Sequence, residues 1–284
     1  MIASGFPHRF LRQRLGLVSL AVLALVAVGA VVGEVLWKYT YTDITSNLYL
    51  PPSLAHPLGT DNGGHDVLAQ VLRGVQRSLT IALLVAALST LFGVAVGAVA
   101  GYFGGLVDTV LMRLTDLVLT VPAIVVLVVL AGAVEDRAGS WALLAVLLAA
   151  LSWTRKARLV RASFRSLRQR EFVEAARAAG ANDARIIWRH LLPSAAAPIS
   201  VAATLTVATA VLAETSLAYL GLGPAPPDTS LGQLVQAGQS SATTHPWLFY
   251  FPALAIVVIV LSVNLIGEAL RRALDPTDAP IAPD

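Results

Sequence analysis

The sequence alternates between long apolar runs and shorter polar segments. An apolar run of about 20 residues crosses roughly 30 Å of bilayer hydrocarbon as an α-helix, because each residue advances the helix by about 1.5 Å. Six such runs occur, at about residues 15–37, 78–102, 110–134, 141–153, 195–220 and 247–270. The pattern therefore predicts an all-α polytopic membrane protein with six transmembrane helices.

Three of these runs carry local signals that modify the prediction. The first follows a basic tail, as in a cleaved signal peptide, but the run is too long for such a peptide and no Ala-x-Ala site closes it. Pro122 should kink the third helix. The fourth run is short, and it can continue through Arg158 into the basic sequence that follows.

Basic residues predict the orientation of the helices, since Lys and Arg concentrate in cytoplasmic segments. With a cytoplasmic N-terminus, 16 of the 20 Lys and Arg residues fall on the inner side. The outer side then holds Lys38, Arg73, Arg77 and Arg137. Both termini and residues 171–193 are therefore predicted to be cytoplasmic.

The chain divides into three parts. Residues 1–77 comprise a cytoplasmic tail, the first span and an extracytoplasmic loop, in which residues 65–76 are predicted to form an amphipathic helix along the outer surface. Residues 78–275 are the core, with the other five spans. Residues 276–284 are rich in proline and are predicted to be disordered.

Composition supports a membrane protein and excludes several functional classes. Of all residues, 56% are hydrophobic and 13% are charged, whereas about a quarter are charged in soluble domains. The net charge of +3 and the pI of 9.5 report the sidedness of Lys and Arg and do not indicate a nucleic-acid partner. The absence of cysteine excludes disulfides, thiolate catalysis and cysteine-ligated metals.

The sequence also lacks the common motifs for ATP binding, zinc catalysis and serine hydrolysis. It has no Gly-x-x-x-x-Gly-Lys-Ser/Thr loop, no His-Glu-x-x-His pair and no Gly-x-Ser-x-Gly elbow. Its five histidines are scattered over loops and tail. We therefore predict no catalytic, metal-binding or cofactor-binding residue in this chain.

Glycines recur every four residues at positions 93, 97, 101 and 105. Small residues at this spacing let helix backbones approach closely. We interpret them as a helix-packing face, within this subunit or against a partner, in preference to a ligand site.

Ionisable and polar residues inside the predicted spans are candidates for a pathway. Glu214 should face the bundle interior or a water-filled cavity, with either a pathway or gating role or a packing role. Asn264 is a second candidate, although an interhelical hydrogen bond fits it better. Arg113 and Asp116, beside Asp108, have the spacing of an i, i+3 ion pair and are interpreted as structural.

The 171–193 segment is a basic, helix-forming stretch between two apolar runs. Gly180 should end a first short helix in the left-handed conformation, Asn182 or Asp183 should cap a second, and Pro193 follows it. Apolar residues lie outside the membrane here, at Phe172, Val173, Ile186, Ile187 and Trp188. A solvated basic loop does not explain them, so we predict a segment that docks in a groove of a partner protein.

These residues resemble a known motif. Glu174-Ala175-Ala176, followed at fixed spacing by Gly180 and by His190-Leu191-Leu192-Pro193, resembles the "EAA" signature of binding-protein-dependent ABC transporter permeases. His190 stands where many of these permeases have Ile. The resemblance extends over about residues 10–276, through segments 56–62, 66–68, 101–105, 107–113, 212–214, 220–223 and 270–276. These segments narrow it to the dipeptide, oligopeptide and nickel importer branch.

The resemblance implies a MetI-like importer permease fold in the cytoplasmic (inner) membrane, with a cytoplasmic coupling helix. It implies a second homologous permease, two cytoplasmic ATPases that bind ATP and Mg²⁺, and an extracytoplasmic substrate-binding protein as partners. The ATPase-coupling residues would be Glu174, Ala175, Ala176, Gly180, Leu192 and Pro193. By this resemblance the chain would carry dipeptides or oligopeptides.

Three alternatives remain at this point. A permease of the same branch could carry nickel or another small solute. An ion-coupled secondary transporter would use Glu214 as its proton carrier and need no ATPase. A membrane-embedded enzyme is disfavoured by the absence of a nucleophile, base or metal set.

Overall fold

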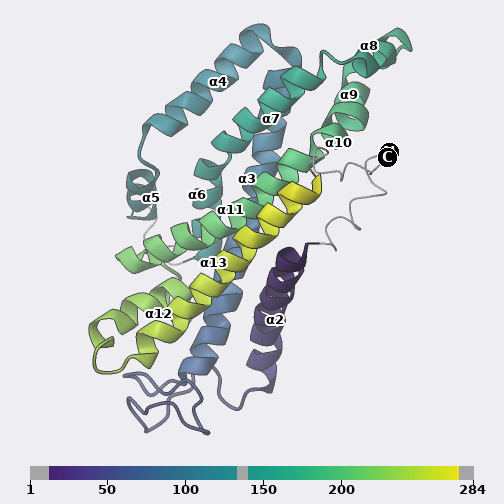
Figure 1. The fold of residues 1–284 in the computed structure, drawn as a ribbon. Helices are drawn as coiled ribbons and strands as arrows, with labels where there is room; N and C mark the ends of the chain where they lie inside the picture. Colours follow the sequence, from purple (N-terminus) through teal and green to yellow (C-terminus); the bar gives the residue numbers. More distant parts are fainter. Residues whose placement is uncertain (1–12, 133–139, 275–284) are drawn as a thin grey trace, which may run out of the picture.

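The computed structural model describes residues 13–132 and 140–274, and these ranges are helical apart from loops and one isolated β-bridge between Thr60 and Asp66 (Figure 1). The predicted disordered tail, the end of the third predicted span, and Arg9, Arg12 and Arg137 lie outside the described residues.

The longer helices form a bundle, with the short helices of residues 171–186 at one end and that of residues 231–238 at the other (Figure 1). In chain order they are α2 (Arg14–Leu36), α3 (Val67–Phe103), α4 (Gly105–Thr120), α5 (Ala123–Gly132), α6 (Trp141–Ser152), α7 (Thr154–Leu167), α8 (Glu171–Ala178), α9 (Asp183–Ile186), α10 (Leu192–Ser194), α11 (Ala196–Leu217), α12 (Leu231–Gly238) and α13 (Trp247–Leu274). We call the end with the 171–193 segment the basic end, and the end with residues 37–66 and α12 the loop end.

Length and apolarity support most of the predicted spans. Four helices of the described residues are long and apolar enough to cross a membrane: α2, α3, α11 with its continuation to Leu222, and α13. The α4–α5 pair qualifies as a fifth span bent by 77°. The shorter apolar α6 joins α7 through Trp153 alone, whose backbone angles are helical, as expected if the fourth span continues into basic sequence. Length alone therefore gives four or five spans.

The start of α3 corrects one prediction. Residues 67–76 are the first turns of α3 and not a separate helix on the outer surface. Asp66 caps this helix by accepting a hydrogen bond from the backbone N–H of Ala69. Val67, Val71 and Val75 are buried in the main core, so this amphipathic face packs against protein and not against the membrane surface.

Pro122 has a stronger effect than a kink. The chain leaves the helical conformation at Val121, and α5 starts again at Ala123. Proline lacks the N–H that a continuous helix would use, and its ring clashes with the preceding turn. The third predicted span is therefore two helices at a steep angle.

The glycine spacing on α3 is confirmed as a helix-packing face within this chain. A Cβ atom at Gly93 would lie 2.8 Å from the carbonyl oxygen of Trp153, and one at Gly101 would lie 2.7 Å from that of Arg161. Gly97 faces Ala157 and Val160 in the same way. Gly105 has no such neighbour and begins α4. The backbones of α3 and α7 thus meet directly.

Acidic residues of α4 pair with α7, and this corrects a second prediction. Asp116 accepts a hydrogen bond from Arg158 at 2.5 Å, in place of the predicted pair with Arg113. Asp108 forms a two-pronged pair with Arg161, with one contact of 2.6 Å. The packing of α4 against α7, and not the i, i+3 spacing on α4, therefore determines these pairs.

We expect Gly97→Ala to separate α3 from α7 and to lower the free energy of unfolding by about 1–3 kcal/mol, as overpacking does in well-packed cores. The apparent melting temperature of the purified chain in detergent measures this change. Gly29→Ala is the matched control, because a Cβ atom at Gly29 would have no neighbour within 4 Å. Equal melting temperatures for the two variants would contradict the packing role of Gly97.

Candidate functional site

The first half of the 171–193 segment is α8 and its C-terminal turn. Gly180 has a φ of +80°, which glycine adopts without steric cost. The backbone N–H of Ala181 donates to the carbonyl of Ala176 at 3.0 Å, and that of Gly180 donates to Arg177 at 2.9 Å. These two bonds form a Schellman motif, which satisfies carbonyls at the end of α8. The predicted helix break at Gly180 is confirmed.

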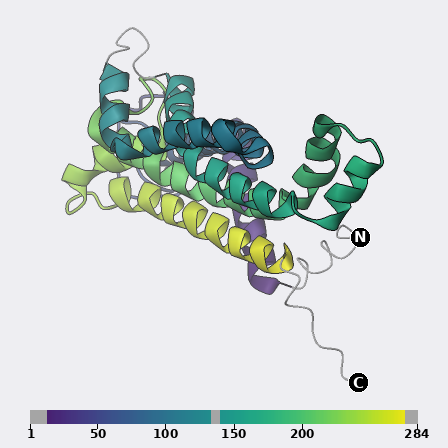
Figure 2. The ribbon, with the colours of Figure 1, turned by 90° about the horizontal axis from the view of Figure 1, so that it is seen from above.

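The second half of the segment leads back into the bundle. The side chain of Asn182 accepts a hydrogen bond from the backbone N–H of Arg185 at 2.9 Å, so Asn182 is the cap of α9. A π-helical turn, Ile187–Leu191, and the short α10 with Pro193 connect α9 to α11. In Figure 2 the segment projects beyond the bundle at the basic end.

Most of the five apolar side chains of the segment face inward. This corrects the prediction that they dock in a groove of a partner protein. Val173 and Ile186 are fully buried, together with Phe164 of α7, in a second hydrophobic cluster at the basic end. Phe172 and Trp188 remain exposed, at 40% and 70%. The segment is therefore anchored by its own chain and offers two large apolar side chains on its surface.

Tyr102, at the end of α3, ties this segment to the bundle. Its hydroxyl donates to a carboxylate oxygen of Asp183 at 2.5 Å. The Arg177 guanidinium lies over the Tyr102 ring, and its hydrogen bond to the Tyr102 hydroxyl raises the pKa of Arg177, which stays charged. Arg168 donates to the backbone carbonyl of Tyr102 at 2.6 Å. One aromatic residue thus connects α3, α7, α8 and α9.

The residues of the EAA-like pattern differ in exposure. Glu174, Ala175, Gly180 and Pro193 are exposed, whereas Ala176 and Leu192 are partly buried. Ala176 and Leu192 pack against the second hydrophobic cluster. The pattern therefore combines residues on the surface of the segment with residues that hold it in place.

Glu214 lies fully buried within α11, as predicted for a carboxylate that faces the bundle interior. Ser78 of α3 donates to one of its carboxylate oxygens at 3.0 Å. The hydroxyl of Ser78 also accepts the backbone N–H of Leu231 at 3.3 Å, at the start of α12. The Ser78–Glu214 pair therefore connects two spans to the loop end.

Asn264 does not fulfil the interhelical prediction within the described residues. It is exposed, and its side chain donates to the carbonyl of Val260 in the same helix at 2.9 Å. The structure does not bring Asn264 and Glu214 together in one site.

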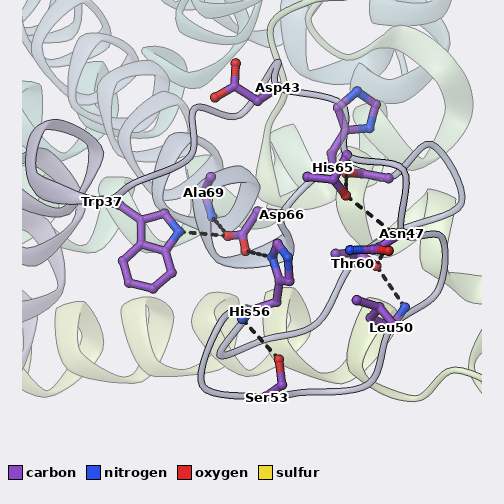
Figure 3. Close-up of polar contacts among 12 residues, drawn as sticks. Trp37, Asp43, Asn47, Leu50, Ser53, His56, Thr60, His65, Asp66 and Ala69 are labelled. Atoms are coloured by element: carbon purple, nitrogen blue, oxygen red, sulfur yellow. Dashed lines mark hydrogen bonds and ion pairs between the residues drawn. The ribbon is translucent and has the colours of Figure 1, made fainter.

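The loop that precedes α3 is fixed by a buried carboxylate (Figure 3). Asp66 accepts hydrogen bonds from the indole of Trp37 at 3.1 Å and from the backbone N–H of Ala69. His56, stacked on Tyr39, contacts the other Asp66 oxygen at 2.7 Å. Residues 37–66 are thereby held as a defined surface over the loop end.

The part of the chain that the structure describes contains no cluster of three or more His, Asp or Glu side chains that could hold a metal ion. Its ion pairs include Arg73 with Asp228 and Arg161 with Asp108, and Lys156 and Glu214 are buried singly.

Comparison with known proteins decides the family. Residues 93–277 match the family described as "Binding-protein-dependent transport system inner membrane component", and residues 6–52 match "N-terminal TM domain of oligopeptide transport permease C". The chain belongs to this permease family. It is therefore a multi-pass inner-membrane permease of the ABC importer class.

Relatives of the permease match almost its whole length. It is 45% identical over 270 residues to a Mycobacterium bovis protein named "Oligopeptide transport system permease protein OppC", with 95% of this chain and 92% of that protein covered. A Brucella suis protein described as a peptide transport system permease is 39% identical over 273 residues, with 95% and 90% covered.

A solved structure shares the fold of the permease. A chain of the MetNI methionine ABC transporter, in inward-facing conformations, superposes with a TM-score of 0.55 at 20% identity. The match covers 74% of this chain and 98% of that chain. This likeness confirms the MetI-like fold.

Sequence reasoning missed several residues that organise the permease. Asp66 stands directly before a helix, and its N-cap position could have been recognised. Tyr102 and Lys156 gave no signal of their own, because their partners Asp183 and Ser89 lie 81 and 67 residues away in the chain.

We expect Tyr102→Phe to loosen the 171–193 segment while the bundle stays intact. The variant loses a hydrogen bond to a charged group, which contributes ~1.5 kcal/mol. Amide hydrogen exchange in α8 and α9 should therefore become roughly tenfold faster. Hydrogen–deuterium exchange with mass spectrometry measures this. Tyr219→Phe, which removes an exposed hydroxyl bonded to Gln239 at the loop end, is the control. Unchanged exchange in α8 and α9 would contradict the role of Tyr102.

Proposed function

We propose that this permease is one of two homologous subunits that form the pathway of an ATP-driven peptide importer. The proposal rests on the structure of the 171–193 segment. Its surface presents Glu174, Ala175 and two exposed aromatic side chains, and its buried apolar residues pack against α3 and α7. Such a rigid projection suits a groove on a partner. The names of the mycobacterial and Brucella relatives support peptides as the cargo.

Both termini and the basic end are cytoplasmic in this proposal, and the loop end is extracytoplasmic. The excess of Lys and Arg on one side supports the orientation. The surface of residues 37–66 and α12 would then receive the substrate-binding protein. The fixed Asp66 network supports this role, because a docking surface needs a defined shape.

Two ATPases would dock on the 171–193 segments of the two permeases and would bind ATP and Mg²⁺, so this chain is not itself an enzyme. Two rigid connections would transmit a movement of the segment to the spans. Tyr102 and the second hydrophobic cluster connect it to α3 and α7, and the turn through Pro193 connects it to α11. Glu214, which connects α11 to α3 and the start of α12, would act as a gating residue at the far end of α11.

Transport by the reconstituted complex tests the proposal. The permease, placed in vesicles with its second permease, ATPases and binding protein, should take up a labelled oligopeptide only when ATP is supplied to the ATPases. Uptake should persist when an ionophore collapses the proton gradient. Uptake driven by a proton gradient without ATP would overturn the ABC mechanism. ATP-driven uptake of labelled nickel in place of peptide would overturn the assignment of peptides as the cargo.

We expect Gly180→Val to insert into the membrane but to weaken ATPase docking, because a left-handed backbone costs a β-branched residue more than ~1 kcal/mol. A Cβ atom there would have no neighbour within 4 Å, so steric contact with the bundle plays no part. Co-purification of the ATPases and initial uptake should both fall severalfold. Gly180→Asn is the control, because asparagine tolerates this conformation. Unchanged co-purification and uptake in the valine variant would contradict the docking role.

A further inference from the structure

A cavity of about 600 Å³, open at the surface, lies beside the break between α4 and α5. Its walls come from α3, from both sides of the Pro122 break, from the α6–α7 junction and from α11. Thr206 and Thr209 line it from the middle of α11. Because Thr206 is about ten residues, or roughly 15 Å, from either end of the helix, the cavity lies near the middle of the bilayer.

The charged residues that line this cavity are all positive. Arg155 and Lys156 contribute to its lining, and no Asp or Glu does. The neighbouring arginines of α7 differ, since Arg158 pairs with Asp116 and Arg161 pairs with Asp108. Among these four cations in the described part of the chain, the two without an acidic partner are therefore the ones that line the cavity.

Lys156 is the less expected of the two, because it is 95% buried, with 5% of its surface exposed. Its ammonium donates to the hydroxyl of Ser89 at 2.5 Å, and that hydroxyl donates to the carbonyl of Val85. An ammonium has three donors, so two remain for other groups. A buried charge at membrane depth is costly and is retained mainly where it serves a pathway or a ligand.

The threonines of the cavity add acceptors. Thr206 donates its hydroxyl proton to the carbonyl of Ala202 at 2.7 Å, and Thr209 donates to that of Thr206 at 3.0 Å. Their oxygens keep lone pairs that can accept from a ligand N–H. The cavity thus combines cationic donors for a carboxylate with hydroxyl acceptors for amides on an apolar wall.

We propose that this cavity is a transient binding site for the C-terminal carboxylate of the transported peptide, held by Lys156 and Arg155. The inference rests on the proposed function and names a subsite within its pathway. The same anion chemistry could come from a lipid headgroup, so the experiment separates the two sources by the lipids of the vesicle.

The test compares a labelled peptide with its C-terminal amide, in vesicles that contain the complete transporter and saturating binding protein. The wild type should take up the free acid roughly tenfold faster than the amide, as expected for one charge-assisted hydrogen bond. Lys156→Met should abolish this ratio by slowing the acid alone, and Lys156→Arg should preserve it. Arg165→Met, which removes an exposed charge of α7 outside this cavity, should leave the ratio unchanged.

The outcomes are distinguishable. An equal loss of acid and amide uptake in Lys156→Met, with the ATPases still co-purifying, would give Lys156 a structural role and overturn the subsite. A loss of uptake of both peptides in Lys156→Met that occurs only in vesicles containing an anionic lipid would assign the cations to a lipid headgroup and also overturn it. No ATP-driven uptake of either peptide by the wild type would instead be a failure of the proposed function.

Discussion

The direct contact between the backbones of α3 and α7 is the constraint on which the rest of the permease depends. It exists because Gly93, Gly97 and Gly101 present no side chain where α7 crosses. This contact fixes α7, and α7 carries Phe164 into the cluster that anchors the 171–193 segment and Lys156 into the membrane cavity. A side chain on the glycine face would displace both.

Polar side chains then hold the bundle together where apolar packing alone gives no specificity. Within a membrane, helices gain little from burying apolar surface against one another, so small-residue contacts and polar pairs determine which faces meet. Asp108 and Asp116 orient α4 on α7, and Ser78 with Glu214 joins α3 to α11. These pairs therefore determine which faces of the helices meet.

The 171–193 segment illustrates how far local sequence rules reach. Gly180 and the capping Asn182 could be recognised from residue type, because the left-handed turn and the side-chain cap are local chemistry. The inward direction of Val173 and Ile186 could not, since it depends on α7, which is brought there by the glycine contact. Contacts within its own chain consequently hold the segment in place. The segment exposes less apolar surface than its composition indicates.

The sequence by itself determined the membrane class, the main apolar helices, the EAA-like pattern and the family, because apolar length, turn chemistry and motif spacing are properties of neighbouring residues. Only the tertiary structure decided that α3 is continuous from Val67, that Asp116 pairs with Arg158 in place of Arg113, and that Lys156 lines a cavity without a carboxylate. These features depend on segments far apart in the chain, and their relative positions follow from helix packing, which no local pattern encodes.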